Sequence, residues 1–229
     1  PRFITLRGLK ITGANSRLNY LNEQDQPARY AKGAAGIHAS VVEHLLIENC
    51  EVTGNDNGVF VNTRENKEPL TSRHITLRGN LVHLNGVEGS FLEHNLYIQA
   101  AGALYEGNFI GQLVAGGAGS SLKDRSSGTV IRYNHIEAAA RAIDLVETDG
   151  GATTVAKEAN YHQAWVYGNL IISDMNNPGR SSTLLIHWGG DINPELFRHG
   201  TLYYYNNTVV MVGSKRQAGV FYVFDMPTA

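Results

Sequence analysis

The chain has 229 residues, of which 42% are hydrophobic and 17% charged, with 25 glycines and 6 prolines. This composition is typical of a globular protein with enough residues to bury a core. The net charge of −2 gives the whole chain no attraction for nucleic acid or an anionic membrane, and no apolar run is long enough to span a membrane. Cys50 is the only cysteine, which excludes an internal disulfide and a cysteine-based metal site.

Short strand-like segments recur along the chain. In order they are "ITLRGLKI" (4–11), "LLIENCEV" (45–52), "ITLRGNLV" (75–82), "ALYEGNFI" (103–110), "VIRYNHI" (130–136), "WVYGNLI" (165–171) and "YYYNNTV" (203–209). One position repeats, two residues before an isoleucine or valine, and it reads Leu9, Cys50, Asn80, Asn108, Asn134, Asn169 and Asn207. The intervals of 41, 30, 28, 26, 35 and 38 residues indicate one repeating coil interrupted by loops of different length.

A second apolar segment follows each of these positions. The segments are "GIHAS" (36–40), "GVFVN" (58–62), "NLYIQ" (95–99), "SLKDR" (121–125), "AIDLVE" (142–147), "TLLIHW" (183–188) and "AGVFYV" (218–223). Paired short strands with a recurrent Asn predict an all-β parallel solenoid of about seven coils. In it the Asn side chains should stack as a hydrogen-bonded ladder and occupy the left-handed backbone of a sharp corner. Because the chain opens and closes inside strand-like segments, we expect residues 1–229 to form a single domain, part of a longer solenoid.

The Asn repeats carry a resemblance to a known group of proteins. Gly-Asn followed by two apolar residues occurs at 79–82, 107–110 and 168–171, and "YNHI" (133–136) and "NNTVV" (206–210) continue the pattern. Over its whole length the chain resembles the right-handed parallel β-helix carbohydrate-active proteins, the pectate lyase-like superfamily. The resemblance implies a single-stranded right-handed β-helix, secreted or periplasmic and monomeric, that acts on a polysaccharide. Such a fold alone does not fix an activity.

Alternation along the second strands predicts which side chains point away from the core. The first outward column reads His38, Phe60, Tyr97, Lys123, Asp144, then Ile186 or His187, and Phe221. The second reads Ser40, Asn62, Gln99, Arg125, and Val146 or Glu147. The charged members should share one solvent-facing surface beside Tyr97, with His94 and His187 near its edges. An aromatic and charged groove suits an acidic polysaccharide.

The segment "SLKDRSSGTVIRYNHI" (121–136) resembles the alginate lyase and chondroitinase B type of polysaccharide lyase. That resemblance implies β-elimination of a uronic-acid-containing polysaccharide, with Lys123 as the base and an Arg on the next coil. The next coil here carries Asp144 instead, which favours the charged form of Lys123. Lys123 then serves as readily to bind the substrate carboxylate, and Tyr97 or His94 takes the proton. The candidate catalytic residues are Lys123, Arg125, Tyr97 and His94, and the candidate substrate-binding residues are Asp144, Glu147, His187, Gln99, Asn62 and His38.

Other functions fit the same residues. The protein could be a non-catalytic carbohydrate-binding or surface-attachment β-helix, or a glycoside hydrolase that uses Asp144 and Glu147. No cofactor is firmly predicted, although calcium could be held by Asp144, Glu147 and Asp149. His44 and His74 occupy equivalent positions in two coils, which predicts a stacked structural pair rather than a zinc site.

Overall fold

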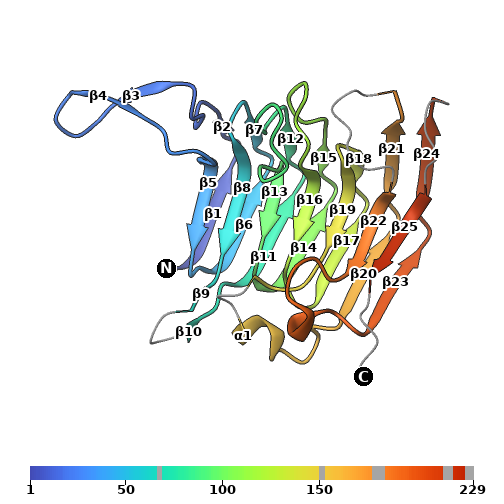
Figure 1. Ribbon diagram of the computed structural model, residues 1–229. Coiled ribbons are helices and arrows are strands. Elements are labelled where there is room, and N and C mark those ends of the chain that lie inside the picture. The colour runs from blue at the N-terminus through green and yellow to red at the C-terminus, as the bar shows by residue number, and fades with distance from the viewer. Residues whose placement is uncertain (66–68, 150–152, 177–183, 214–218, 225–229) are drawn as a thin grey trace.

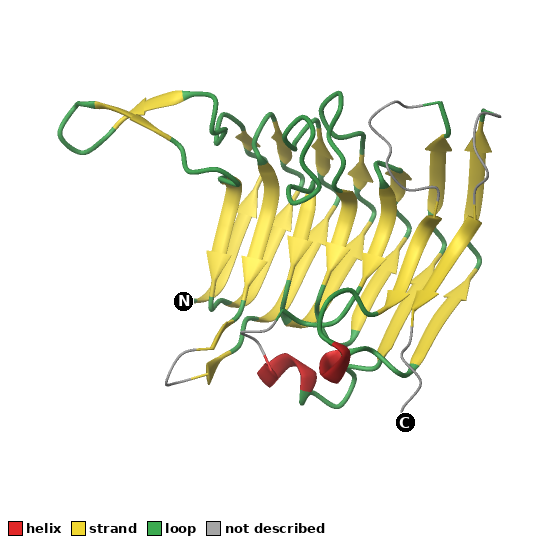
Figure 2. Ribbon diagram, in the orientation of Figure 1, coloured by secondary structure: helices red, strands yellow, loops and turns green. Residues whose placement is uncertain are grey.

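The computed structural model describes residues 1–65, 69–149, 153–176, 184–213 and 219–224. The fold is all-β, with parallel strands in stacked sheets, and is consistent with a parallel β-helix (Figures 1 and 2). The described residues form three seven-stranded sheets, and the chain visits each sheet in turn before it adds the next strand to each.

The first sheet contains β1 (Arg2–Arg7), β6 (Glu43–Glu48), β11 (Arg73–Arg78), β14 (Ala101–Glu106), β17 (Thr129–Arg132), β20 (Gln163–Tyr167) and β23 (Thr201–Tyr205). The second contains β2 (Lys10–Ile11), β7 (Glu51–Thr53), β12 (Leu81–His83), β15 (Phe109–Ile110), β18 (His135–Glu137), β21 (Leu170–Asp174) and β24 (Thr208–Val212). The third contains β5 (Ala35–Ser40), β8 (Asn57–Asn62), β13 (Leu96–Ile98), β16 (Ser120–Asp124), β19 (Arg141–Leu145), β22 (Leu184–Gly189) and β25 (Gly219–Phe224). Two hairpins, β3 (Asn19–Leu21) with β4 (Pro27–Arg29) and β9 (Arg64–Glu65) with β10 (Pro69–Leu70), and two short helices, α1 (Thr153–Ala156) and η1 (Pro194–Leu196), lie in the connections.

The predicted Asn ladder is confirmed. The side-chain amide of Asn80 donates to the amide oxygen of Asn108 at 2.9 Å, and the same bond repeats at 2.9 Å from Asn108 to Asn134, Asn134 to Asn169 and Asn169 to Asn207. The ladder ends at Cys50, whose backbone N–H donates to the Asn80 amide oxygen at 2.9 Å. Each such bond stabilises the fold by about 0.5–1.5 kcal/mol net, and the ladder holds successive coils in one register.

The left-handed backbone was expected at the ladder Asn itself, and that expectation was wrong. It falls on the preceding residue, with φ of 62°, 64° and 67° at Gly79, Gly107 and Gly168. Tyr133 and Asn206 take the same position with φ of 59° and 53°. The two residues of the repeated Gly-Asn pair therefore have different roles at the corner. The glycine turns the chain without a Cβ clash, and the Asn side chain bonds to the next coil.

A second ladder, which the repeat pattern did not predict, lies at the corner between the second and third sheets. The side-chain amide of Asn55 donates to Asn85 at 3.0 Å, and that of Asn85 donates to Asn95 at 2.9 Å. Asn95 follows Asn85 by only ten residues in sequence, because both lie in the single connection between β12 and β13 rather than in successive coils. This irregular spacing conceals the ladder from a search for repeats.

Candidate functional site

The first outward column of the third sheet is confirmed over its central strands. Tyr97 on β13 pairs in register with Lys123 on β16, Lys123 with Asp144 on β19, and Asp144 with His187 on β22. Leu96, Leu122 and Ile143, one residue earlier on each strand, have no exposed surface, as inward-pointing residues should. Lys123 and its neighbours are therefore lateral neighbours on the outer face of the sheet.

The last member of this column was predicted wrongly. Strand β25 pairs Tyr222 with His187, and Phe221 with Ile186, so Tyr222 and not Phe221 continues the row. The His187 ring contacts Tyr222 with ring centroids 4.8 Å apart. A one-residue shift moves every side chain of a strand to the other face, and its register depends on the preceding loop, which the sequence pattern does not measure.

The expected solvent-facing surface is instead covered. Lys123, Arg125 and Asp144 retain only 8%, 4% and 1% of their exposure. The segment between β22 and β23, orange in Figure 1, crosses over the outer face of the third sheet. Beneath the covering loops remains a cleft of about 490 Å³. It is lined by Phe91, Leu92, His94, Tyr97, Ala118, Ser120, Lys123, Arg125, Ala140, Arg141, Asp144, Asp149, Asp191 and Ile192.

Two cations in the cleft converge on one carboxylate oxygen. Lys123 Nζ lies 2.9 Å and Arg125 Nη2 lies 3.1 Å from Oδ2 of Asp191. Lys123 and Arg125 are two residues apart on one side of the chain at β16, which is why both point into the cleft. Burial alone would raise the pKa of Asp191, but the Lys123 ammonium outweighs it and lowers that pKa. Asp191 is thus an anion bound by two cations, and the pair Lys123 and Arg125 is called the carboxylate seat below. Asp191 was not predicted from the sequence.

Asp144 is the centre of a buried hydrogen-bond network. Its Oδ2 accepts from Lys123 Nζ at 3.0 Å and from the Ser120 hydroxyl at 3.2 Å. Its Oδ1 lies 2.7 Å from His187 Nδ1 and 3.1 Å from Arg141 Nη1. Burial alone would raise the pKa of Asp144, but the His187 hydrogen bond and the Lys123 and Arg141 charges lower it overall. Asp144 therefore keeps its negative charge and is ion-paired with Lys123.

Glu147 anchors the loop that brings Asp191 to the cleft. Its carboxylate accepts the backbone N–H groups of Asp191, Ile192 and Asn193 at 2.7, 2.6 and 2.8 Å. The other end of the loop is fixed by Arg198, which is 1% exposed and donates to the Ser126 carbonyl at 2.6 Å. These three bonds bury the Glu147 carboxylate and fix the position of the loop.

His94 and Tyr97 line the cleft on and just before β13, the strand next to β16. The His94 Nδ1 accepts the Ser120 backbone N–H at 2.8 Å, and burial, with the Lys123 charge, lowers the pKa of His94 to about 3. The neutral ring therefore carries its proton on Nε2 and acts as a donor, not as a base. Burial raises the pKa of the Tyr97 hydroxyl to about 12, and the Arg125 guanidinium lies 5.8 Å from the centre of its ring.

Of the six predicted binding residues, Asp144 lines the cleft, and Glu147, His187, Gln99, Asn62 and His38 lie outside its lining. Gln99 is buried and accepts the Asp149 backbone N–H at 3.2 Å, so it supports the loop after β19. Asn62 and His38 lie on β8 and β5, two and three strands from β16 in the sheet. His38 contacts the edge of Phe60, with ring centroids 5.2 Å apart.

Two of the three acids proposed as calcium ligands are bound to other groups. Asp144 is bonded to Lys123, Arg141, the His187 ring and a hydroxyl, and Glu147 accepts three backbone N–H groups, so both are poorly placed to ligate calcium. Among the described residues, no group of three or more His, Cys, Asp or Glu side chains is placed to hold a metal ion. The predicted His44–His74 stack is present, with ring centroids 4.6 Å apart.

Comparison with known proteins gives no assignment. No protein-family model, no curated protein and no solved structure matches this chain. Within the described part of the chain, none of the helices has the length and apolar character needed to cross a membrane.

Proposed function

We propose that this protein is a polysaccharide-degrading enzyme, a lyase that cleaves a uronic-acid-containing polysaccharide by β-elimination. The supporting observation is the convergence of Lys123 and Arg125 on a single carboxylate oxygen, at 2.9 and 3.1 Å, in a cleft of about 490 Å³. Two converging cations are what a uronate carboxylate requires. In the proposed complex the substrate carboxylate takes the place of the Asp191 side chain, which is 29% exposed and can rotate away from the seat.

The chemistry follows from neutralising that carboxylate. When its charge is balanced by Lys123 and Arg125, the neighbouring C5–H bond becomes more acidic, because the carbanion that forms is stabilised. Lys123 Nζ is occupied by its hydrogen bond to Asp144, so we assign the base to Tyr97 in its ionised form. Tyr97 takes the C5 proton, a C4=C5 double bond forms, and the C4–O bond breaks. The proton that Tyr97 gained then passes to the departing glycosidic oxygen.

The wider assignment is part of the same proposal. A right-handed parallel β-helix of about seven coils agrees with the strong preference for right-handed connections between parallel strands. An acidic polysaccharide as partner and a secreted or periplasmic location follow from the proposed activity and from the resemblance to the pectate lyase-like proteins.

Incubation with polygalacturonate, alginate and chondroitin sulfate tests the activity. A lyase will produce the ultraviolet absorbance of an unsaturated uronate, and Lys123→Ala should abolish it. Binding without this absorbance would refute the lyase and favour a non-catalytic carbohydrate-binding or surface-attachment protein. New reducing ends without the absorbance would indicate a hydrolase, although the three backbone N–H groups on Glu147 disfavour Asp144 and Glu147 as its catalytic pair.

A further inference from the structure

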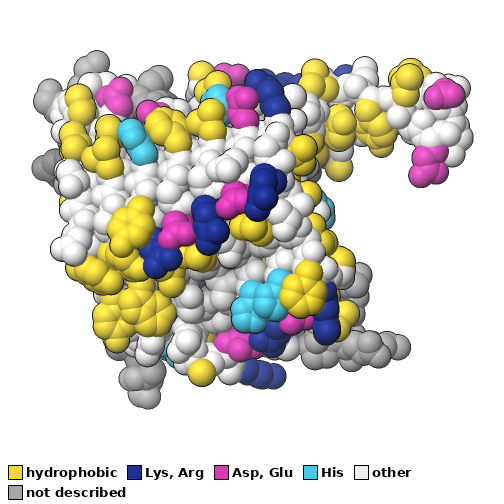
Figure 3. Space-filling view, turned by 180° about the vertical axis from the view of Figure 1, so that it is seen from behind, with side chains coloured by type: hydrophobic (Ala, Val, Ile, Leu, Met, Phe, Trp, Pro, Cys, Tyr) yellow, Lys and Arg dark blue, Asp and Glu magenta, His cyan; other side chains and the backbone are white. Residues whose placement is uncertain are grey.

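The outer face of the first sheet, which is separate from the cleft, carries three parallel rows of side chains. The upper row is a charged ladder in register, Arg7, Glu48, Arg78, Glu106 and Arg132, followed by Tyr167 and Tyr205. Figure 3 shows this face, with alternating basic and acidic side chains running across it toward a hydrophobic region. The middle row ends with Leu104, Val130, Trp165 and Tyr203.

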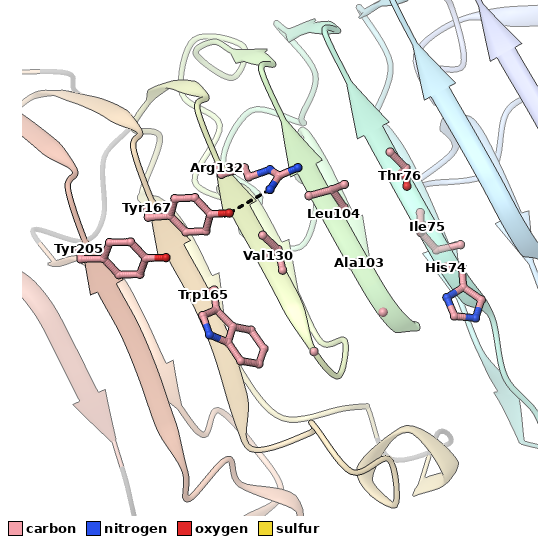
Figure 4. Close-up of a pocket in the computed structure, with 12 residues that line it drawn as sticks. His74, Ile75, Thr76, Ala103, Leu104, Val130, Arg132, Trp165, Tyr167 and Tyr205 are labelled. Atoms are coloured by element: carbon pink, nitrogen blue, oxygen red, sulfur yellow. Dashed lines mark hydrogen bonds between the residues drawn. The ribbon is translucent and has the colours of Figure 1, made fainter.

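The lower row contains a gap where two glycines replace side chains. After His74 come Gly102 and Gly128, with φ of 83° and 59°. The resulting hollow has a volume of about 450 Å³ and is lined by residues of β11, β14, β17, β20 and β23 (Figure 4). Its floor is formed by Leu104 and Val130, which are smaller than the rings at either end.

Rings bound the hollow at its two ends. The Tyr203 ring is stacked on the indole of Trp165, with centroids 5.4 Å apart and planes inclined by 7°. Tyr203 lies on the β23 side, so the other indole face is turned toward β17, where Val130 holds the same register position. His74 is backed in the same way by His44, and its other face is turned toward Gly102.

The charges beside the hollow are already balanced. Arg132 Nη1 donates to the Tyr167 hydroxyl at 3.0 Å, and its Nη2 is paired with Glu106. The lining residues therefore offer polar groups and ring faces but no unpaired carboxylate or guanidinium, in contrast to the seat formed by Lys123 and Arg125. This electrostatic character matches an uncharged sugar better than a uronate.

We propose that this hollow binds a neutral pyranose unit of a glycan chain, stacked on the open face of Trp165. The inference does not depend on the lyase activity. It identifies a second carbohydrate site on a different sheet, which would hold the protein on a mixed glycan while the cleft engages acidic residues. Linked sites of this kind raise the apparent affinity for a polymer that spans both.

Intrinsic fluorescence provides the test, because Trp165 is half-buried at the hollow and the other tryptophan, Trp188, is buried at 5% exposure. We would titrate the protein with cellohexaose, mannohexaose and xylohexaose, and with hexagalacturonate as the acidic comparison. A neutral hexasaccharide should change the emission, and Trp165→Ala should weaken its binding, measured by calorimetry, at least about tenfold.

Two further variants make the result decisive. Val130→Tyr places a ring in the hollow at a β-strand position beside Trp165, where it should stack without harming the fold and should abolish binding. Tyr20→Ala removes an exposed ring from the remote β3–β4 hairpin and should change nothing. The proposal is overturned if no neutral hexasaccharide binds, if Val130→Tyr binds as well as the wild type, or if only hexagalacturonate binds and Lys123→Ala removes that binding.

Discussion

Replacing Asp191 with asparagine tests whether Lys123 and Arg125 form a seat for a substrate carboxylate. The substitution preserves the backbone N–H that Glu147 accepts and the shape of the side chain, but removes the negative charge. In the wild type an incoming uronate must displace two charge-assisted hydrogen bonds, at 2.9 and 3.1 Å. Each of these bonds is worth about 1.5–3 kcal/mol when fully formed. The net cost of displacing Asp191 is smaller than their sum, because the uronate forms both bonds again with the same cations.

An asparagine amide competes far less well for two cations than a carboxylate does. If half of the strength of the displaced pair is recovered, about 1.5–3 kcal/mol, the affinity for a uronate hexasaccharide rises by roughly ten- to 150-fold. The gain should shrink as salt is added, because the interaction is ionic. Calorimetric titration with hexagalacturonate and hexaguluronate at two ionic strengths measures both effects.

Asp174→Asn is the matched control, since it removes the same charge from an exposed position on β21. It should leave the affinity within about twofold of the wild type. If Asp191→Asn binds uronates no better than Asp174→Asn, then the two cations do not form a carboxylate seat, and the reasoning behind the proposed function fails.

Three further predictions concern the cleft and the ladder. Tyr97→Phe should abolish elimination, and wild-type turnover should rise about tenfold per pH unit from neutral toward alkaline pH, because the pKa of Tyr97 near 12 makes its ionised form scarce; a flat profile would exclude Tyr97 as the base. Asp144→Asn should lower the free energy of unfolding by about 1.5–3 kcal/mol, since Lys123 keeps only Asp191 as its anion and His187 loses its bond to a carboxylate. Glu43→Gln, at a half-buried surface position, should cost less than about 1 kcal/mol in the same denaturant titration. Asn134→Ala should cost about 2–3 kcal/mol in that assay because Asn108 loses its acceptor, and an unchanged unfolding midpoint would contradict the assigned role of the ladder.

The ladder and the central outward column could be predicted from sequence because both depend on short-range patterns. A strand alternates every two residues, and the Asn recurs at one position of each coil, so Lys123 and Asp144 could be placed side by side without coordinates. The same reasoning failed at Phe221, where the register depends on a loop rather than on alternation.

Asp191 and the burial of the cleft could not be predicted in this way. Asp191 lies 68 residues after Lys123 and reaches it from an irregular loop held by Glu147 and Arg198. Neither anchor forms a periodic signal, and a carboxylate that accepts backbone N–H groups looks in sequence like any other acid. The buried Glu147 was identified as a site residue for its charge, whereas its contacts assign it to holding the loop.

The Asn ladder keeps the coils in register whatever the length of the loops between them. Coil lengths differ by up to 12 residues between Asn80 and Asn207, yet the amide-to-amide bonds keep the same 2.9 Å length along that whole span. The connections can thus lengthen, shorten or be exchanged while Lys123 keeps its place beside Asp144. A change of specificity therefore requires only a different loop between two ladder positions, while the Asn ladder itself stays unchanged.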